Sequence, residues 1–119
     1  MWGDYMKLLV FILNNADKLD KLINEFAKND LTGATVINSS GVAQKILQSN
    51  DETLSTIVGS LKMILNRKNV PNNTILMVVK EEKVNIVVEV IESVVGSLDE
   101  PGNGIVFTVP VDFVKGFKH

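Results

Sequence analysis

The spacing of apolar and polar positions predicts that strands and helices alternate along the chain. Four short segments are rich in apolar and β-branched residues, a composition typical of strands. They cover residues 6–13, 33–38, 74–79 and 105–109. Pro71 breaks the chain before the third segment, and Pro110 is expected to end the fourth.

Three other segments show helical spacing. In residues 19–28 the apolar positions recur every three or four residues, and Asn15 is placed to cap the segment. Residues 54–65 repeat the pattern and predict a second helix. Residues 81–95 are rich in valine and isoleucine, which favour strands, but their polar positions fall three or four apart and never alternate. We therefore predict a third helix, ending near Gly96.

This order of elements predicts an α+β fold. Without the helix at 54–65, the chain reads βαββαβ, the order of ferredoxin-like domains. We therefore expect a ferredoxin-like βαββαβ sandwich with an extra helix inserted between strands 2 and 3. Residues 1–5 match no pattern and are interpreted as an N-terminal extension, and residues 6–119 as a single domain.

The predicted strands have more apolar surface than two helices can cover. Residues 8–13, 75–79 and 105–107 are apolar on both faces, whereas the helices of this fold cover one face of the sheet. The inserted helix or a subunit interface must cover the other face, and we favour a homo-oligomer. Aspartate at Val106 or Met77 is expected to release subunits or unfold the chain.

Composition narrows the function classes. The 119 residues are 45% hydrophobic and 22% charged, with a net charge of −2 and Arg67 as the single arginine, so nucleic-acid binding is not expected. There is no cysteine, and no apolar run is long enough for a membrane span. The first residues lack the pattern of a signal peptide, so we expect a cytoplasmic protein. No cluster of histidine and carboxylates has metal-ligand spacing, and His119 is terminal, so we expect neither a metal site nor a catalytic one.

Glycine turns are the strongest candidates for a binding site. Gly102, Asn103 and Gly104 precede the last strand, and such a turn exposes backbone N–H groups that can hold an anion. A plain connection between helix and strand is the alternative. Gly33 and Gly41 flank the second strand in the same way. We expect valine at Gly104 to block a ligand and leave the oligomer intact, because the side chain would not touch the interface core.

These residues resemble the nitrogen-regulatory PII signalling proteins, and more closely their divergent PII-like branch. The resemblance covers residue 6 to about residue 118 and includes Gly33-x-Thr35 leading to Gly41, where that family's T-loop begins, and Gly102-x-Gly104 at its B-loop. PII proteins are trimers that bind adenine nucleotides between subunits and signal to partner proteins through the T-loop. The resemblance therefore implies a homotrimer with a small-molecule effector and a partner protein. It implies a ligand site formed by Gly33, Thr35, Gly41, Gln44, Lys45, Gly102, Asn103, Gly104, Lys115 and Lys118.

Two departures from the family pattern affect the expected ligand. The family has a lysine directly after the second B-loop glycine, where this chain has Ile105, and Asp99 and Glu100 make the approach acidic. Of the family's cationic closing tail, Lys115 and Lys118 remain. A triphosphate needs several cationic donors. We therefore expect a ligand with less charge than ATP, such as an adenosine monophosphate-type nucleotide or a carboxylate metabolite, and the sequence leaves the choice and any cofactor unknown.

Two alternatives remain open. A trimeric metal-tolerance protein of CutA type shares the expected architecture. A small acylphosphatase-like enzyme on the same fold needs an arginine cradle for phosphate, and Arg67 falls after the predicted inserted helix. A non-catalytic regulatory protein is therefore the preferred interpretation.

Overall fold

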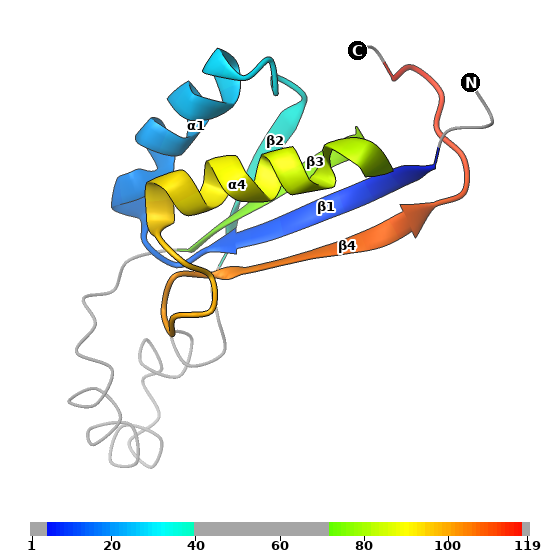
Figure 1. The fold of residues 1–119 in the computed structure, drawn as a ribbon. Helices are drawn as coiled ribbons and strands as arrows, with labels where there is room; N and C mark the ends of the chain where they lie inside the picture. Colours follow the sequence, from blue (N-terminus) through cyan, green and yellow to red (C-terminus); the bar gives the residue numbers. More distant parts are fainter. Residues whose placement is uncertain (1–4, 40–71, 118–119) are drawn as a thin grey trace, which may run out of the picture.

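The computed structural model describes residues 5–39 and 72–117 (Figure 1). The predicted helix at 54–65 lies outside these residues. The elements in chain order are β1 (Met6–Leu13), a 3₁₀ turn (Ala16–Lys18), α1 (Leu19–Lys28), β2 (Ala34–Ser39), β3 (Asn72–Lys80), a second 3₁₀ turn (Glu81–Lys83), α4 (Val84–Val95) and β4 (Ile105–Val111).

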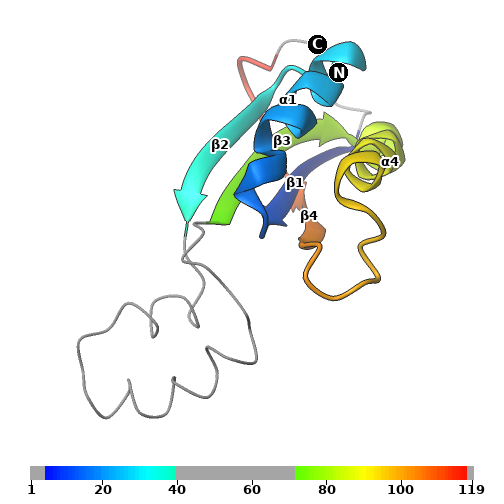
Figure 2. The ribbon, with the colours of Figure 1, turned by 90° about the vertical axis from the view of Figure 1, so that its left-hand side faces the viewer.

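The four strands form one antiparallel sheet in the order β2-β3-β1-β4. Figures 1 and 2 show α1 and α4 side by side on the same face of this sheet. The predicted α+β class and the arrangement of a ferredoxin-like sandwich are therefore confirmed. The first strand of the chain lies in the middle of the sheet, where β3 and β4 pair with its two edges.

Strand β1 alternates strictly between the two faces of the sheet. Leu9, Phe11 and Leu13 are fully buried beneath the helices, and their neighbours in the ladders include Met77, Ile75 and Val106. The helices supply the other half of this core through buried side chains of α1 and α4, namely Leu22, Phe26, Val87, Val90, Ile91, Val94 and Val95. The periodicity of residues 84–95 thus gave the correct helix despite their β-branched side chains.

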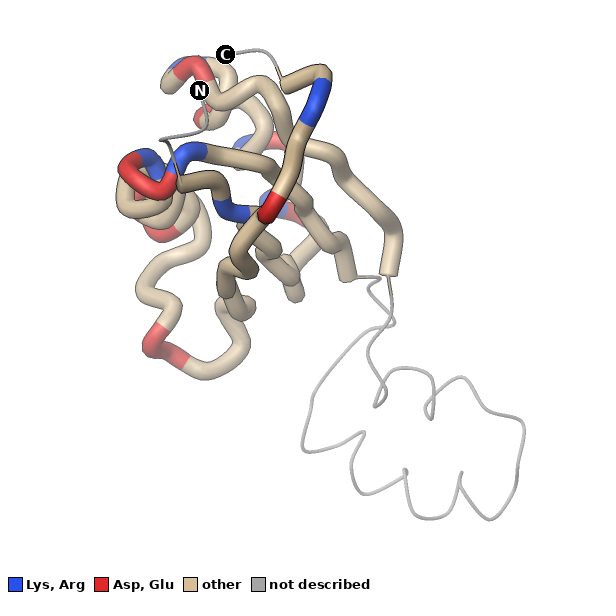
Figure 3. The backbone as a smooth tube through the Cα atoms, turned by 90° about the vertical axis from the view of Figure 1, so that its right-hand side faces the viewer, with Lys and Arg blue, Asp and Glu red and all other residues tan. Residues whose placement is uncertain are grey.

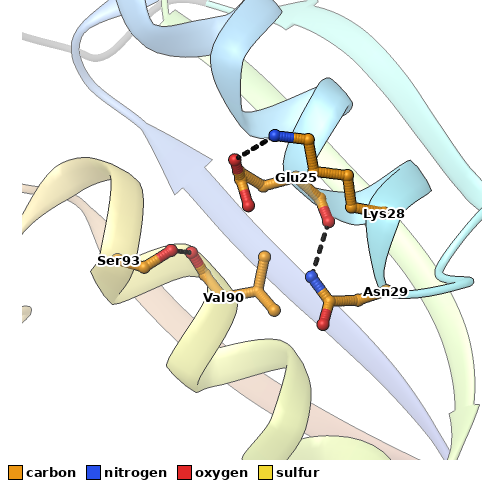
Figure 4. A network of polar contacts seen from close by, with 5 residues as sticks. All are labelled: Glu25, Lys28, Asn29, Val90 and Ser93. Carbon is orange, nitrogen blue, oxygen red and sulfur yellow. Dashed lines mark hydrogen bonds and ion pairs between the residues drawn. The ribbon is translucent and has the colours of Figure 1, made fainter.

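Short polar contacts fix the ends of α1. The Asn15 side chain accepts a hydrogen bond from the Asp17 amide at 3.1 Å, which confirms the predicted cap at the 3₁₀ turn that leads into α1. At the other end, Asn29 Nδ2 donates to the Glu25 carbonyl at 2.8 Å, and Lys28 pairs with the Glu25 carboxylate at 3.3 Å (Figure 4). The loop to β2 therefore leaves α1 in a defined direction.

The predicted end of the last strand is wrong. Strand β4 continues through Pro110 to Val111, and Pro110 lies opposite Lys7 of β1. Because β4 is an edge strand, proline can lie in it with its missing N–H on the solvent side. Strand β3 also begins two residues before the predicted start, and residues 81–83 form a 3₁₀ turn in place of the first turn of the predicted helix.

Candidate functional site

The candidate site centres on residues 96–104, the α4–β4 loop, which leaves the end of α4 and enters β4 (Figure 1). Gly102 and Gly104 have φ angles of 86° and 111°, values that side-chain-bearing residues rarely adopt. Gly102 is exposed, whereas Gly104 is partly buried. The predicted glycine turn is therefore present, and the two glycines lie in different environments.

Gly104 is required by the core. A Cβ atom at this position would lie 2.5 Å from the Ile12 carbonyl oxygen and 2.8 Å from Cε1 of Phe11. Both neighbours belong to the central strand, whose backbone cannot shift without disturbing two ladders. Valine at Gly104 is therefore expected to disturb the chain's own core in addition to blocking a ligand, because the side chain would enter the space filled by Phe11.

Hydrogen bonds from side chains hold the first half of the α4–β4 loop. The Glu92 carboxylate accepts a hydrogen bond from the Leu98 amide at 2.8 Å, and the Glu92 carbonyl accepts one from the Gly96 amide at 3.0 Å. Asn103 Nδ2 donates to the Ser97 carbonyl at 2.7 Å and so ties the second half of the loop to the first. Sequence reasoning placed Glu92 only on the polar side of its helix. Its position four residues before Gly96, at the end of the helix, was the one feature of the sequence that indicated a contact with the loop.

The described candidate residues do not converge within one chain. Gly33 precedes β2 at one end of the sheet, and Gly104 precedes β4 at the opposite end and opposite edge. Three strand spacings and about five residues along the strands separate them by about 20 Å. Thr35 is level with Phe107 in the register but lies across the whole sheet from it, and Lys115 follows β4 in the tail. The other predicted site residues, Gly41, Gln44, Lys45 and Lys118, lie outside the described residues.

The tip of the α4–β4 loop is acidic. Asp99 and Glu100 are exposed there, and residues 96–107 contain neither lysine nor arginine. Figure 3 shows this acidic segment at the turn of the loop. In the described part of the chain, no group of three or more histidine, cysteine, aspartate or glutamate side chains is arranged to hold a metal ion. No helix among the described residues is long and apolar enough to cross a membrane.

The sheet face opposite the helices, here called the open face, is largely apolar. Alternation along the strands places Leu8, Val10, Ile12, Leu76, Val78, Ile37, Ile105, Phe107 and Val109 on it. Four of these side chains, Ile37, Ile105, Phe107 and Val109, are between 44% and 56% exposed. The predicted apolar second face is therefore present.

The residues chosen from the sequence to test this face lie elsewhere. Val106 packs against the core beneath the helices, and Met77 is 2% exposed within that core. Aspartate at either position would place a charge inside the chain's own core. Of the two expected outcomes, subunit release and unfolding, these substitutions can therefore report only on unfolding.

Comparison with known proteins gives one family. A model of the family described as nitrogen regulatory protein P-II matches residues 6–118. No curated protein matches the chain. Among solved structures, the crystal structure of a functionally unknown protein from Pediococcus pentosaceus ATCC 25745 is similar, with 19% sequence identity and a TM-score of 0.62. That match covers 97% of this chain and 100% of the other, and at this identity it supports the fold alone.

Proposed function

The chain belongs to the nitrogen regulatory protein P-II family, and from this premise we propose a non-catalytic regulatory protein that senses a small ligand between the subunits of a homotrimer. The open face is the observation that carries this proposal. Four large apolar side chains on it are about half exposed, whereas the helices bury Leu9, Phe11 and Ile75 at the centre of the opposite face completely. Large exposed apolar patches on soluble proteins mark interaction surfaces.

Assembly through the open face suits the separation of the candidate residues. Thr35 lies on β2 and Gly102 precedes β4, at opposite edges of one sheet. Sheets that pack around a common axis bring the β2 edge of one subunit toward the β4 edge of the next. The proposed cleft therefore combines Thr35 of one chain with the α4–β4 loop of its neighbour. Signalling to a partner protein is the output that the family suggests.

The charges around the loop restrict the ligand. The exposed amides of a glycine turn can hold one anionic group. A triphosphate would meet the carboxylates of Asp99 and Glu100, with Ile105 as the 56% exposed side chain at the head of β4. We therefore propose a ligand of low charge, with adenosine monophosphate as the first compound to test.

Assembly is tested by light scattering coupled to size-exclusion chromatography. The wild-type chain should elute with the mass of three subunits, and Phe107→Asp should give the mass of one, because it places a charge on the open face. Thr108→Asp is the matched control, since the next residue of β4 is exposed and points to the other face. A monomeric wild-type chain, or a Phe107→Asp trimer, would contradict the proposed assembly.

Ligand binding is tested by thermal unfolding with AMP, ADP and ATP at several concentrations. A ligand that binds only the folded protein raises the melting temperature further as its concentration increases. AMP should stabilise the protein more than ATP does. Strong stabilisation by ATP with magnesium would show that the missing cations do not restrict the site.

A further inference from the structure

We propose that Glu92 and Asn103 hold the α4–β4 loop in a single shape before any ligand binds, and that Asn103 is a positioning residue and not a ligand contact. That this loop shape matters for ligand binding rests on the proposed function. The hydrogen bonds that define it are internal to the chain, so they can be tested without a ligand.

Glu92 holds the loop where it leaves the helix. Its carboxylate reaches past the end of α4 to the Leu98 amide, while its carbonyl accepts from Gly96. The bond to Leu98 is part-buried, and the Leu98 side chain packs against the core. A hydrogen bond to a charged acceptor is stronger than one between neutral groups, and more so when water is partly excluded. Glu92 therefore sets the direction in which the loop departs.

Asn103 closes the loop on itself. Its side-chain nitrogen donates to the Ser97 carbonyl at 2.7 Å and lies 3.3 Å from the place where a Cβ of Gly96 would be. The amide group thus lies beside Gly96, whose φ of 91° already requires glycine. Ser97 also accepts hydrogen bonds from Asp99 through its hydroxyl and from Glu100 through its carbonyl. The Asn103 side chain is therefore engaged with the base of the loop.

These contacts leave a short tip for recognition. Residues 99–102 are all exposed, whereas Leu98 and Gly104 on either side of the tip are fixed by the core. A loop that is ordered in advance loses less conformational entropy when a ligand binds. Pro101 has no N–H, and the Asp99 and Glu100 amides already donate to Ser97. The amide of the exposed Gly102 is therefore the group on this loop that we expect to contact a ligand.

Hydrogen exchange of the ligand-free protein tests whether the Glu92 and Asn103 hydrogen bonds hold the loop. Glu92→Ala should speed exchange of the Leu98 amide by about tenfold, and Asn103→Ala should speed exchange at Leu98 and Glu100 by a similar factor. Amides of the central strand, such as Leu9, should keep their wild-type rates. Ser93→Ala is the matched control, because Ser93 neighbours Glu92 and its hydroxyl bonds back to the Val90 carbonyl at 2.6 Å (Figure 4).

An unchanged exchange rate of the Leu98 amide in Glu92→Ala would contradict the proposal that Glu92 holds the loop. A second measurement, AMP affinity at a temperature where all variants are folded, separates positioning from contact. If Asn103 positions the loop, faster exchange and an affinity loss of about tenfold should occur together in both variants. Loss of affinity in Asn103→Ala with wild-type exchange would identify a direct contact and refute the positioning role. Failure of AMP to bind the wild-type protein would count against the proposed ligand. The exchange rates would still show whether Glu92 and Asn103 hold the loop.

Discussion

Replacing Gly104 with alanine should be one of the most destabilising single-methyl changes in this chain. The new Cβ would lie 2.5 Å from the Ile12 carbonyl oxygen and 2.8 Å from the Phe11 ring. Real Cβ atoms do not approach other atoms so closely, and the contacted groups belong to the central strand. The backbone also has a φ of 111°, which alanine adopts only under strain.

The magnitude follows from two separate costs. A non-glycine residue in a sparsely populated backbone region costs about 1 to 3 kcal/mol. Forcing an extra carbon into a packed core costs a further 1 to 3 kcal/mol or so. We therefore expect Gly104→Ala to lower the free energy of unfolding by about 4 kcal/mol, a large share of the roughly 5 to 15 kcal/mol typical of a domain. At about 4 °C per kcal/mol, the melting temperature should fall by about 15 °C.

Two other glycines separate the two costs. Gly116 has a φ of 87° and nothing within 4 Å of its Cβ position, so alanine there should cost only the backbone strain, about 1 kcal/mol. Gly33 has neither a close neighbour nor a positive φ, so alanine there should change stability by less than about 0.5 kcal/mol. All variants are compared by urea unfolding at one protein concentration, since assembly makes stability depend on concentration. A Gly104→Ala protein as stable as Gly116→Ala would refute the reasoning.

Two further predictions concern part-buried polar contacts. Lys18→Met should lower the free energy of unfolding, measured in urea, by about 0.5 kcal/mol, because the Lys18 ammonium donates to the Val94 carbonyl at 3.3 Å at the negative end of α4. Lys21→Met, which replaces an exposed lysine of α1, should change this free energy little. Equal losses in the two variants would contradict a specific contact of Lys18. Asn73→Asp should destabilise strongly, since Asn73 is 4% exposed and its side chain donates to Asn38 at 3.1 Å. Burial raises the pKa of the introduced carboxyl group, so the loss of stability measured by thermal unfolding should be larger at pH 7 than at pH 4. A loss of stability independent of pH would show that the carboxylate reaches water.

Local sequence patterns were sufficient for most of the fold. The eight residues of β1 were predicted to the residue, because an apolar segment that is interrupted only at Lys7 and ends before Asn14 has few alternatives. The identity of α4 followed from the spacing of its polar residues. The end of β4 was missed because the effect of Pro110 depends on whether its strand is central or at an edge, and that is a property of the whole sheet.

The candidate site was less accessible to sequence reasoning. The positive φ angles at Gly102 and Gly104 were predictable, because glycines close to a strand commonly mark such turns. Gly104 proved to serve packing against Phe11, a contact that links residues far apart in the chain. The hydrogen bond that the Leu98 amide donates to the Glu92 carboxylate was also not predicted, because a glutamate near a helix end has many possible partners. Long-range contacts thus decide which residues of a motif are free to bind a ligand.

The position of the candidate residues ties ligand binding to assembly. Thr35 and Gly102 lie toward opposite edges of the same sheet, so one chain cannot place both against one small molecule. If the proposed cleft forms between subunits, the ligand binds only the assembled state and must stabilise it by mass action. Phe107→Asp should then abolish the thermal shift with AMP, although Phe107 is outside the proposed set of ligand contacts. Thr108→Asp should retain both the trimer and the shift. A Phe107→Asp monomer that still responded to AMP would place the ligand site within a single chain.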